Sequence, residues 1–209
     1  MISDYSTLPP GLPEPEDDGA ADHLEAMPVA SAPLPATSGD TVDLSSLHGR
    51  TVVYCYPMTG APDNPTPDDW DMIPGARGCT PQSCAFRDHY QEIRDLGADV
   101  YGLSTQTTRY QREAVERLHL PFELLSDVDR EFAGAMRLPT FEIDRLPRGV
   151  GSSMLVKRLT MILNRWSRRE SLLSSLSAGQ GRGIGSGMAE TEPWRTLLSG
   201  CLRCRDGAL

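Results

Sequence analysis

Two cysteines stand five positions apart at the point where a helix is expected to begin. Cys79 and Cys84 lie in the run Gly-Cys-Thr-Pro-Gln-Ser-Cys, and apolar residues follow at steps of four, three and three, the spacing of one helix face. These apolar positions are Phe86, Tyr90, Ile93 and Leu96. Thr80 offers a capping hydroxyl, and Pro81 suits the first helical position, where an N–H has no intrahelical partner. The sequence predicts a helix to residue 96 with Cys79 at its start, where unpaired N–H groups and the helix dipole favour a thiolate.

The segments around this helix alternate between strand and helix patterns. β-branched and aromatic runs predict strands, and amphipathic runs predict helices. The predicted strands cover 41–44, 51–56, 99–103, 121–125, 140–143 and 154–163, and the predicted helices cover 79–96, 107–118 and 127–136. This alternation is typical of an α/β fold, a central and mostly parallel sheet flanked by helices. The long loop 58–77, rich in proline and glycine, precedes Cys79, and loops of this length in compact domains tend to be functional.

The two ends of the chain differ in composition from its middle. Residues 1–43 carry nine acidic groups and no Lys or Arg, which accounts for the whole net charge of −9. We predict an acidic, Pro/Ala-rich, disordered leader over 1–37, a domain over 38–163 and a Ser/Gly-rich tail over 164–209. The alternating glycines of the tail have neither a preceding strand nor the G-x-G-x-x-G spacing, so a dinucleotide site is not indicated.

Composition also narrows the class of protein. Residues 44–209 balance at 20 basic and 20 acidic groups, which does not suit a nucleic-acid-binding surface. No apolar run reaches the ~18 residues that span a bilayer, and the first residues lack the basic and apolar regions of a secretory signal. We expect a cytoplasmic protein without nucleic-acid or membrane partners. Its five cysteines are expected to be reduced or catalytic rather than structural disulfides.

The sequence resembles the peroxiredoxins and, within them, the Q-type or bacterioferritin-comigratory subgroup. The similar stretches are Tyr-Cys-Tyr-Pro at 54–57, the Gly-Cys-Thr-x3-Cys run with its Arg-Asp at 78–88, and the segments 102–105, 122–127 and 157–162. The resemblance extends over residues 38–163. It implies a thioredoxin-like fold and a thiol-dependent peroxidase that requires no metal or organic cofactor.

The resemblance also assigns roles to three residues. By it, Cys79 is the peroxidatic cysteine, Cys84 the resolving cysteine, and Arg158 the strand arginine that faces the peroxidatic sulfur. Hydrogen peroxide or an organic hydroperoxide would oxidise Cys79 to a sulfenic acid, which would condense with Cys84 to a disulfide. A thioredoxin-like protein would then supply electrons. The expected assembly is a monomer or a weak homodimer.

Helix geometry adds a prediction about this disulfide. Five helical steps place Cys84 about 7.5 Å along the axis and about 140° around it from Cys79. A disulfide needs Cα atoms within about 7 Å and converging Cβ atoms. We therefore predict that the first turns of the helix unwind during turnover.

One departure from the family pattern lies before the first cysteine. The family motif is Pro-x3-Thr-x2-Cys, and its proline and threonine positions are occupied here by Met72 and Ala76. Pro57 and Thr59 are candidates for the displaced motif residues. Pro57 lies 22 residues before Cys79 where the motif has 7, so this assignment implies an insertion of 15 residues.

A second departure is the tail, which lacks the last core strand and helix of the family. A synonymous coding of residues 164–189 exists that, read one base later, gives IGGVAEKVFYPVFPPDKDAESVAGWL. This peptide has a strand pattern, a Pro-Pro turn and a helix-like ending that resemble the family terminus. The pattern favours a frameshift near codon 164. A chain without its last interior strand would be a destabilised, inactive product.

Other interpretations stay open. The same two helix cysteines suit a thiol–disulfide oxidoreductase that acts on protein substrates. Cys201 and Cys204 form a Cys-x2-Cys pair, which is half of a zinc site if the helix cysteines supply the other half. Arg77 is either a second cation beside the thiolate or a solvated loop residue.

Overall fold

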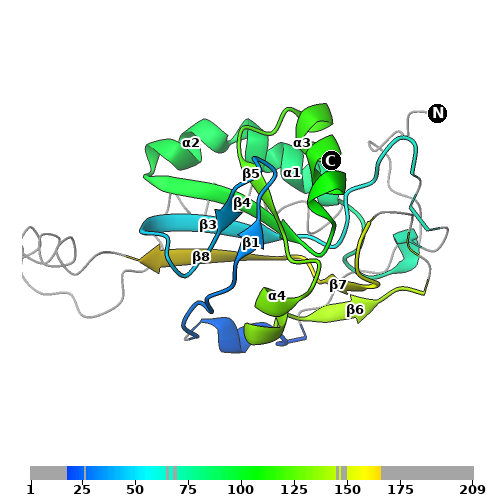
Figure 1. The fold of residues 1–209 in the computed structure, drawn as a ribbon, viewed down its shortest axis with the longest axis horizontal. Coiled ribbons are helices and arrows are strands. Elements are labelled where there is room, and N and C mark those ends of the chain that lie inside the picture. The colour runs from blue at the N-terminus through cyan, green and yellow to red at the C-terminus, as the bar shows by residue number, and fades with distance from the viewer. Residues whose placement is uncertain are drawn as a thin grey trace, which may run out of the picture.

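A four-stranded sheet forms the centre of the fold (Figure 1). The structure, a computed structural model, describes residues 18–25, 27–64, 66–67, 70–144, 146 and 150–165. The strands lie in the order β5-β4-β3-β8 and span Gly49–Cys55 (β3), Ala98–Ser104 (β4), Glu123–Ser126 (β5) and Leu159–Arg165 (β8). The first three of these run parallel, and β8 runs antiparallel to β3. The predicted α/β class with a mostly parallel central sheet is confirmed.

Helices cover both faces of this sheet (Figure 1). One face carries α1, α2 and α3, and the other carries α4 and the short 3-10 helix η1. Their bounds are Cys79–Asp88 (α1), Tyr90–Asp95 (α2), Thr108–Leu118 (α3), Glu131–Ala135 (α4) and Asp22–Leu24 (η1). Alternate residues of β3 divide between two apolar cores, with Val52 and Tyr54 in one and Val53 and Cys55 in the other. This period of two is what a strand buried on both faces requires. Within the described residues, no helix is long and apolar enough to cross a membrane.

Two short hairpins lie outside the central sheet. β1 (Leu34–Pro35) pairs antiparallel with β2 (Thr41–Val42), and β6 (Thr140–Glu142) pairs antiparallel with β7 (Met154–Val156). The second hairpin extends away from the sheet beyond the start of β8, as Figure 1 shows.

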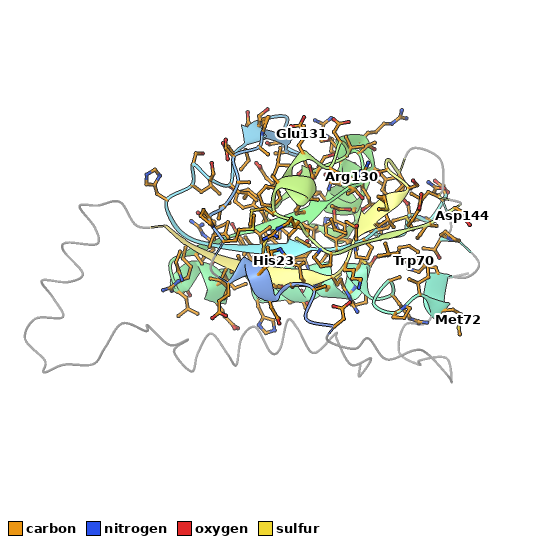
Figure 2. The ribbon with its side chains drawn as sticks, turned by 90° about the horizontal axis from the view of Figure 1, so that it is seen from below. His23, Trp70, Met72, Arg130, Glu131 and Asp144 are labelled. Carbon is orange, nitrogen blue, oxygen red and sulfur yellow. The ribbon has the colours of Figure 1, made fainter. Side chains whose placement is uncertain are left out.

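The described residues of the long loop before α1 pack against the domain. A 3-10 helix, η2 (Trp70–Met72), lies at the end of the molecule that also carries Asp144 (Figure 2). The Trp70 side chain is buried in a third apolar cluster, whose other members include Met58, Ala76, Tyr110 and Val150. The predicted insertion therefore forms one wall of the region around the start of α1.

The N-terminal segment is more ordered than its composition predicts. A disordered leader over 1–37 is wrong for Ala32, Leu34 and Ala36, which are buried in the core against α4. Ala36 bridges to Leu125, so the segment covers the outer edge of β5. Buried and exposed residues alternate here as in a strand, a pattern that the acidic average composition hides. Residues 1–17 lie outside the described part of the chain.

The predicted helix over 79–96 forms as two helices. α1 ends at Asp88 and α2 begins at Tyr90, because His89 between them leaves the helical conformation (φ −99°, ψ 10°). Hydrogen bonds nevertheless cross the junction, from the His89 N–H to Ala85 and from the Ile93 N–H to His89. This continuity explains why the apolar period runs unbroken through both helices.

The start of α1 also differs from the prediction. Gly78, not Thr80, is the N-cap, and it has a φ of 96° that glycine adopts without a Cβ clash. Cys79 is therefore the first helical residue and Pro81 the third. Pro81 is still tolerated, because the first four N–H groups of a helix have no intrahelical partner.

The predicted strand over 154–163 forms as two strands. β7 ends at Val156 and β8 begins at Leu159, so Lys157 and Arg158 lie in the connection between them. Arg158 is consequently not inside a strand, as the sequence predicted, but at the entrance to one.

β8 also continues two residues beyond the predicted end of the domain. Asn164 pairs with Arg50 and Arg165 pairs with Gly49 at the far end of β3. Residues 166–209 lie outside the described part of the chain, so the rest of the predicted tail and its Cys-x2-Cys pair have no structural account here.

We expect Gly102→Ala in β4 to destabilise the fold by about 1–3 kcal/mol, the usual cost of overpacking a core. A Cβ at this position would lie 2.4 Å from Leu124 Cδ2 and 2.8 Å from the Tyr54 ring. Both neighbours are fully buried, so neither moves away without disturbing other contacts. Urea unfolding measures the change.

The matched control is Gly134→Ala in α4, where an added Cβ meets no atom within 4 Å. This change is expected to stabilise the fold slightly, by up to about 1 kcal/mol, because alanine favours the helix. Unfolding midpoints that are equal for Gly102→Ala and the unaltered protein would contradict the packing argument.

Candidate active site

Cys79 is the first residue of α1, and its thiol is enclosed. The residue is 3% exposed, and its Sγ donates a hydrogen bond to the carbonyl of Ala76 at 3.3 Å. Burial raises the pKa of the Cys79 thiol, while the charge of Arg158 and the N–H groups of Met58 and Cys79 act in the opposite direction. Burial of the Cys79 thiol thus disfavours the thiolate that the helix start favours. The sequence pattern does not reveal this burial.

Arg158 acts on Cys79 from the connection between β7 and β8. Its positive charge is the strongest of the influences that lower the pKa of the Cys79 thiol. Such an influence weakens with distance, so Arg158 is close enough to act on the Cys79 thiol. The fold therefore brings together two of the three residues singled out in the sequence, although they are far apart in the chain.

The segment that follows β3 forms another wall of this site. The Met58 N–H acts on the Cys79 sulfur as a hydrogen-bond donor. Thr59, the next residue, is fully buried, and its hydroxyl donates to Oε1 of Gln106 at 3.2 Å. Met58, which lies between the two proposed displaced motif residues, therefore adjoins Cys79 in space, despite the long loop between them in sequence. Ala76 contributes its carbonyl at the position where the family motif has a threonine side chain.

Cys84 lies on the same intact helix and is only partly buried. Burial raises the pKa of its thiol, Arg87 and Arg117 lower it, and Asp88 raises it. Cys79 and Cys84 are both unpaired thiols in this structure. The two arginines belong to different helices, so the surroundings of Cys84 include the end of α3 as well as α1.

A hydrogen-bond chain beneath α1 ties its first turn to the sheet. Tyr54 in β3 donates to Ser83 Oγ at 3.1 Å, and Ser83 Oγ donates to the Cys79 carbonyl at 3.0 Å. Burial raises the pKa of Tyr54, so its hydroxyl stays protonated and remains a donor. The Tyr54 ring also stacks on Phe86, with centroids 4.5 Å apart. Unwinding of the first turn of α1 would have to break this chain.

Arg77 and Cys55 have surroundings that differ from those of Cys79. Arg77 forms an ion pair with the exposed Asp71 at 3.1 Å, as a loop arginine does. Cys55 in β3 is fully buried in the core against α4. In the part of the chain that the structure describes, no group of three or more His, Cys, Asp or Glu side chains is placed to hold a metal ion.

Comparison with known proteins places this site in a family. Residues 72–165, which include Cys79, Cys84 and Arg158, match the AhpC/TSA family. This segment belongs to the AhpC/TSA family. The resemblance to peroxiredoxins that the sequence suggested is thereby confirmed at the level of the family.

Individual relatives of this AhpC/TSA segment carry peroxiredoxin names. The chain is 34% identical to a chloroplastic peroxiredoxin Q of Oryza sativa subsp. japonica over 110 residues, which are 52% of this chain and 44% of that protein. It is 29% identical to peroxiredoxin Bcp of Bacillus subtilis over 137 residues, which are 65% of this chain and 74% of that protein. The match thus spans less than half the length of the rice protein.

The fold of the AhpC/TSA segment and its surroundings also resembles a solved structure. The C45S mutant of peroxiredoxin 6 from Arenicola marina superposes with a TM-score of 0.51 at 12% identity, over 79% of each chain. A similarity at this identity concerns the fold alone. It agrees with the thioredoxin-like α/β arrangement of the sheet and helices.

Gln106 is the residue of this AhpC/TSA site that the sequence analysis missed. It is fully buried and contacts Thr59 through its side-chain amide. One signal was available: Gln106 follows β4, as Pro57 follows β3, and the carboxyl ends of adjacent parallel strands meet at one edge of a sheet. This rule would have placed a polar residue after the second strand near the residues after the first.

The surroundings of Cys79 predict a steep pH dependence of its reactivity. Because its pKa is raised, the thiol is mostly protonated at neutral pH, and the thiolate fraction grows about tenfold per pH unit below the pKa. We expect alkylation of Cys79 by iodoacetamide to accelerate continuously from pH 6 to pH 8. Mass spectrometry of the tryptic peptide 78–87, with fragmentation to separate Cys79 from Cys84, measures the rate. A rate that is already constant below pH 7 would contradict the raised pKa.

Proposed function

We propose that this protein is a thiol-dependent peroxidase with Cys79 as the nucleophile. The observation that carries the proposal is the convergence of an arginine charge and a backbone N–H on an enclosed cysteine at a helix start. A thiolate that attacks a peroxide needs such groups, because negative charge moves onto the leaving oxygen as the O–O bond breaks. Membership of the AhpC/TSA family supports the same chemistry.

The reaction proceeds by transfer of one oxygen to sulfur. The Cys79 thiolate attacks the terminal oxygen of a hydroperoxide, the S–O bond forms and the O–O bond breaks. The products are a sulfenic acid on Cys79 and an alkoxide or hydroxide, which takes up one proton to give an alcohol or water. Arg158 stabilises the thiolate before attack and the charge on the departing oxygen during it. The Thr59 hydroxyl is the candidate for binding the peroxide, because the N–H of Met58, the preceding residue, acts on the Cys79 sulfur as a hydrogen-bond donor.

Cys84 resolves the sulfenic acid in this proposal. Its sulfur attacks the Cys79 sulfur, a disulfide forms and water leaves. Helix geometry requires the first turns of α1 to unwind for this step, which would break the hydrogen-bond chain from Tyr54 through Ser83 to Cys79. A thioredoxin-like dithiol protein would return two electrons and two protons. The protein would work in the cytoplasm as a monomer or weak homodimer.

Peroxide consumption tests the proposal. The reduced protein, with dithiothreitol as electron donor, should remove many equivalents of hydrogen peroxide faster than dithiothreitol alone. Consumption no faster than that background, in a protein whose Cys79 is still alkylated by iodoacetamide, would refute the peroxidase function.

The C-terminal segment supports a proposal about the gene as well. The AhpC/TSA match ends at residue 165, and β8 is the outermost strand of the described sheet. A further strand, such as the one in the shifted peptide, would add at this edge. We propose a frameshift near codon 164, and sequencing the DNA there tests it. An unbroken frame shared by close relatives with this same tail would overturn the idea.

A further inference from the structure

Gln106 directs three side-chain hydrogen bonds to a single residue, Thr59. Its Oε1 accepts from the Thr59 N–H and from Thr59 Oγ1, each at 3.2 Å, and its Nε2 donates to the Thr59 carbonyl at 3.3 Å. Both residues are fully buried. A buried amide that pairs with the N–H, the carbonyl and the hydroxyl of one residue fixes both its backbone and its rotamer.

The backbone of Thr59 also determines which way the amide is turned. The Thr59 N–H requires an acceptor and its carbonyl requires a donor, so Oε1 and Nε2 of Gln106 cannot be exchanged. Thr59 Oγ1 therefore faces an acceptor and must be the donor in that bond. Since its only proton is used there, Oγ1 has lone pairs left and can serve only as an acceptor toward a second group.

Gln106 is itself fixed at the ends of two core strands. Its N–H donates to Ser104 Oγ at 3.2 Å, and its carbonyl accepts from Ser126 Oγ at 2.7 Å. These serines are the last residues of β4 and β5. Ser104 Oγ also donates to the Pro57 carbonyl at 3.0 Å. The whole segment from Pro57 to Thr59 is thus held against the sheet, where geometry is more rigid than on a free loop.

We propose that Gln106 is a positioning residue for peroxide reduction. Gln106 holds the proton of the Thr59 hydroxyl in a hydrogen bond to its own Oε1, which leaves Thr59 Oγ1 to accept a hydrogen bond from the O–H of the bound peroxide. The inference rests on the proposed peroxidase function. The oxygen that carries this O–H is the one that forms the S–O bond with Cys79, so its hydrogen bond to Thr59 aligns it for attack. The proton stays on that oxygen in the sulfenic acid, and the leaving oxygen takes its own proton as described above.

The test compares two reactions of Cys79 that differ in their need for Thr59. Gln106→Met keeps a side chain of similar length but removes all three hydrogen bonds. We expect it to lower the second-order rate constant for hydrogen peroxide about 10- to 100-fold, because misplacement of a substrate-binding group has effects of this size. Alkylation of Cys79 by iodoacetamide needs no hydroxyl acceptor, and its rate should change less than twofold. Thr59→Val should show the same selective loss, and the double variant should be no slower than Thr59→Val alone.

Gln111→Met in α3 is the matched control. Gln111 is also fully buried, and its amide donates to the Tyr56 hydroxyl and the Leu125 carbonyl instead of contacting Thr59. Gln111→Met should lower the melting temperature without changing the ratio of the rate of peroxide reduction to the rate of Cys79 alkylation. Equal slowing of peroxide reduction and alkylation by Gln106→Met, or a further loss when it is added to Thr59→Val, would overturn the positioning role. If the unaltered protein is alkylated at Cys79 but inert to peroxide, the peroxidase function itself fails, and this outcome is distinguishable from the others.

Discussion

Peroxide turnover is expected to vanish when Cys79 is replaced by serine. A serine hydroxyl does not ionise near neutral pH and forms no sulfenic acid, so the oxygen-transfer step has no acceptor. The rate in the dithiothreitol-coupled assay should fall to that of the buffer without protein. The fold should be kept, because the two side chains differ by one atom and Ser83, Tyr54 and the backbone of α1 are unchanged.

Cys55→Ala is the control for this loss. Cys55 is fully buried, burial raises its pKa, and it lies in the core on the α4 side of the sheet. Its removal should leave peroxide turnover intact. If Cys79→Ser retained turnover, the nucleophile would have been misassigned. If the unaltered protein exchanged disulfides of a protein substrate but did not consume peroxide, the thiol–disulfide oxidoreductase interpretation would replace the peroxidase one.

Replacing Arg158 by glutamine is expected to slow the reaction of Cys79 with hydrogen peroxide about 10²- to 10³-fold, the usual effect of removing one charge-stabilising donor. Two causes contribute. The pKa of Cys79 should rise further, because Arg158 is the strongest influence that lowers it. The departing oxygen would also lose a cation that balances its charge. Stopped-flow measurement of the single-turnover rate over a pH range separates these causes, since a higher pH restores only the first.

Arg158→Lys should recover part of this loss, because it keeps a point charge but not the planar fork of donors. Arg77→Gln is the matched control, since that arginine is paired with Asp71 on the loop before α1. It should change the rate less than about threefold, as expected for an exposed ion pair. An Arg158→Gln rate within threefold of the unaltered protein would remove Arg158 from the site.

The fold could be predicted where a local pattern decides the structure. The β-branched run of β3 and the amphipathic period of α3 gave the right elements within a few residues. The break at His89 could not be predicted, because the apolar period continues through it. β7 and β8 are separated by Lys157 and Arg158, two residues that the predicted single strand included. The buried residues at 32–36 were hidden in a segment whose average composition favours disorder.

Some features of the candidate site could likewise be predicted from the sequence, and others depend on the tertiary fold. Cys79 and Cys84 could be singled out because their spacing and the helix pattern are local, and Arg158 because the sequence resembles a family. The enclosure that raises the pKa of Cys79 is a tertiary property to which the loop before α1 contributes Ala76. The pairing of Gln106 with Thr59 depends on the ends of β3 and β4 being neighbours. Neither the enclosure of Cys79 nor the pairing of Gln106 with Thr59 could be predicted from spacing along the chain.

One digestion tests the central claim most directly. Trypsin cleavage after Arg77 and Arg87 places Cys79 and Cys84 alone together in the peptide 78–87. In the reduced protein, iodoacetamide should alkylate this peptide twice. After one equivalent of hydrogen peroxide, it should appear without alkylation and lighter by two hydrogens than the unmodified reduced peptide, the mass of a Cys79–Cys84 disulfide. A peptide that is still doubly alkylated after the peroxide has been consumed would contradict the account.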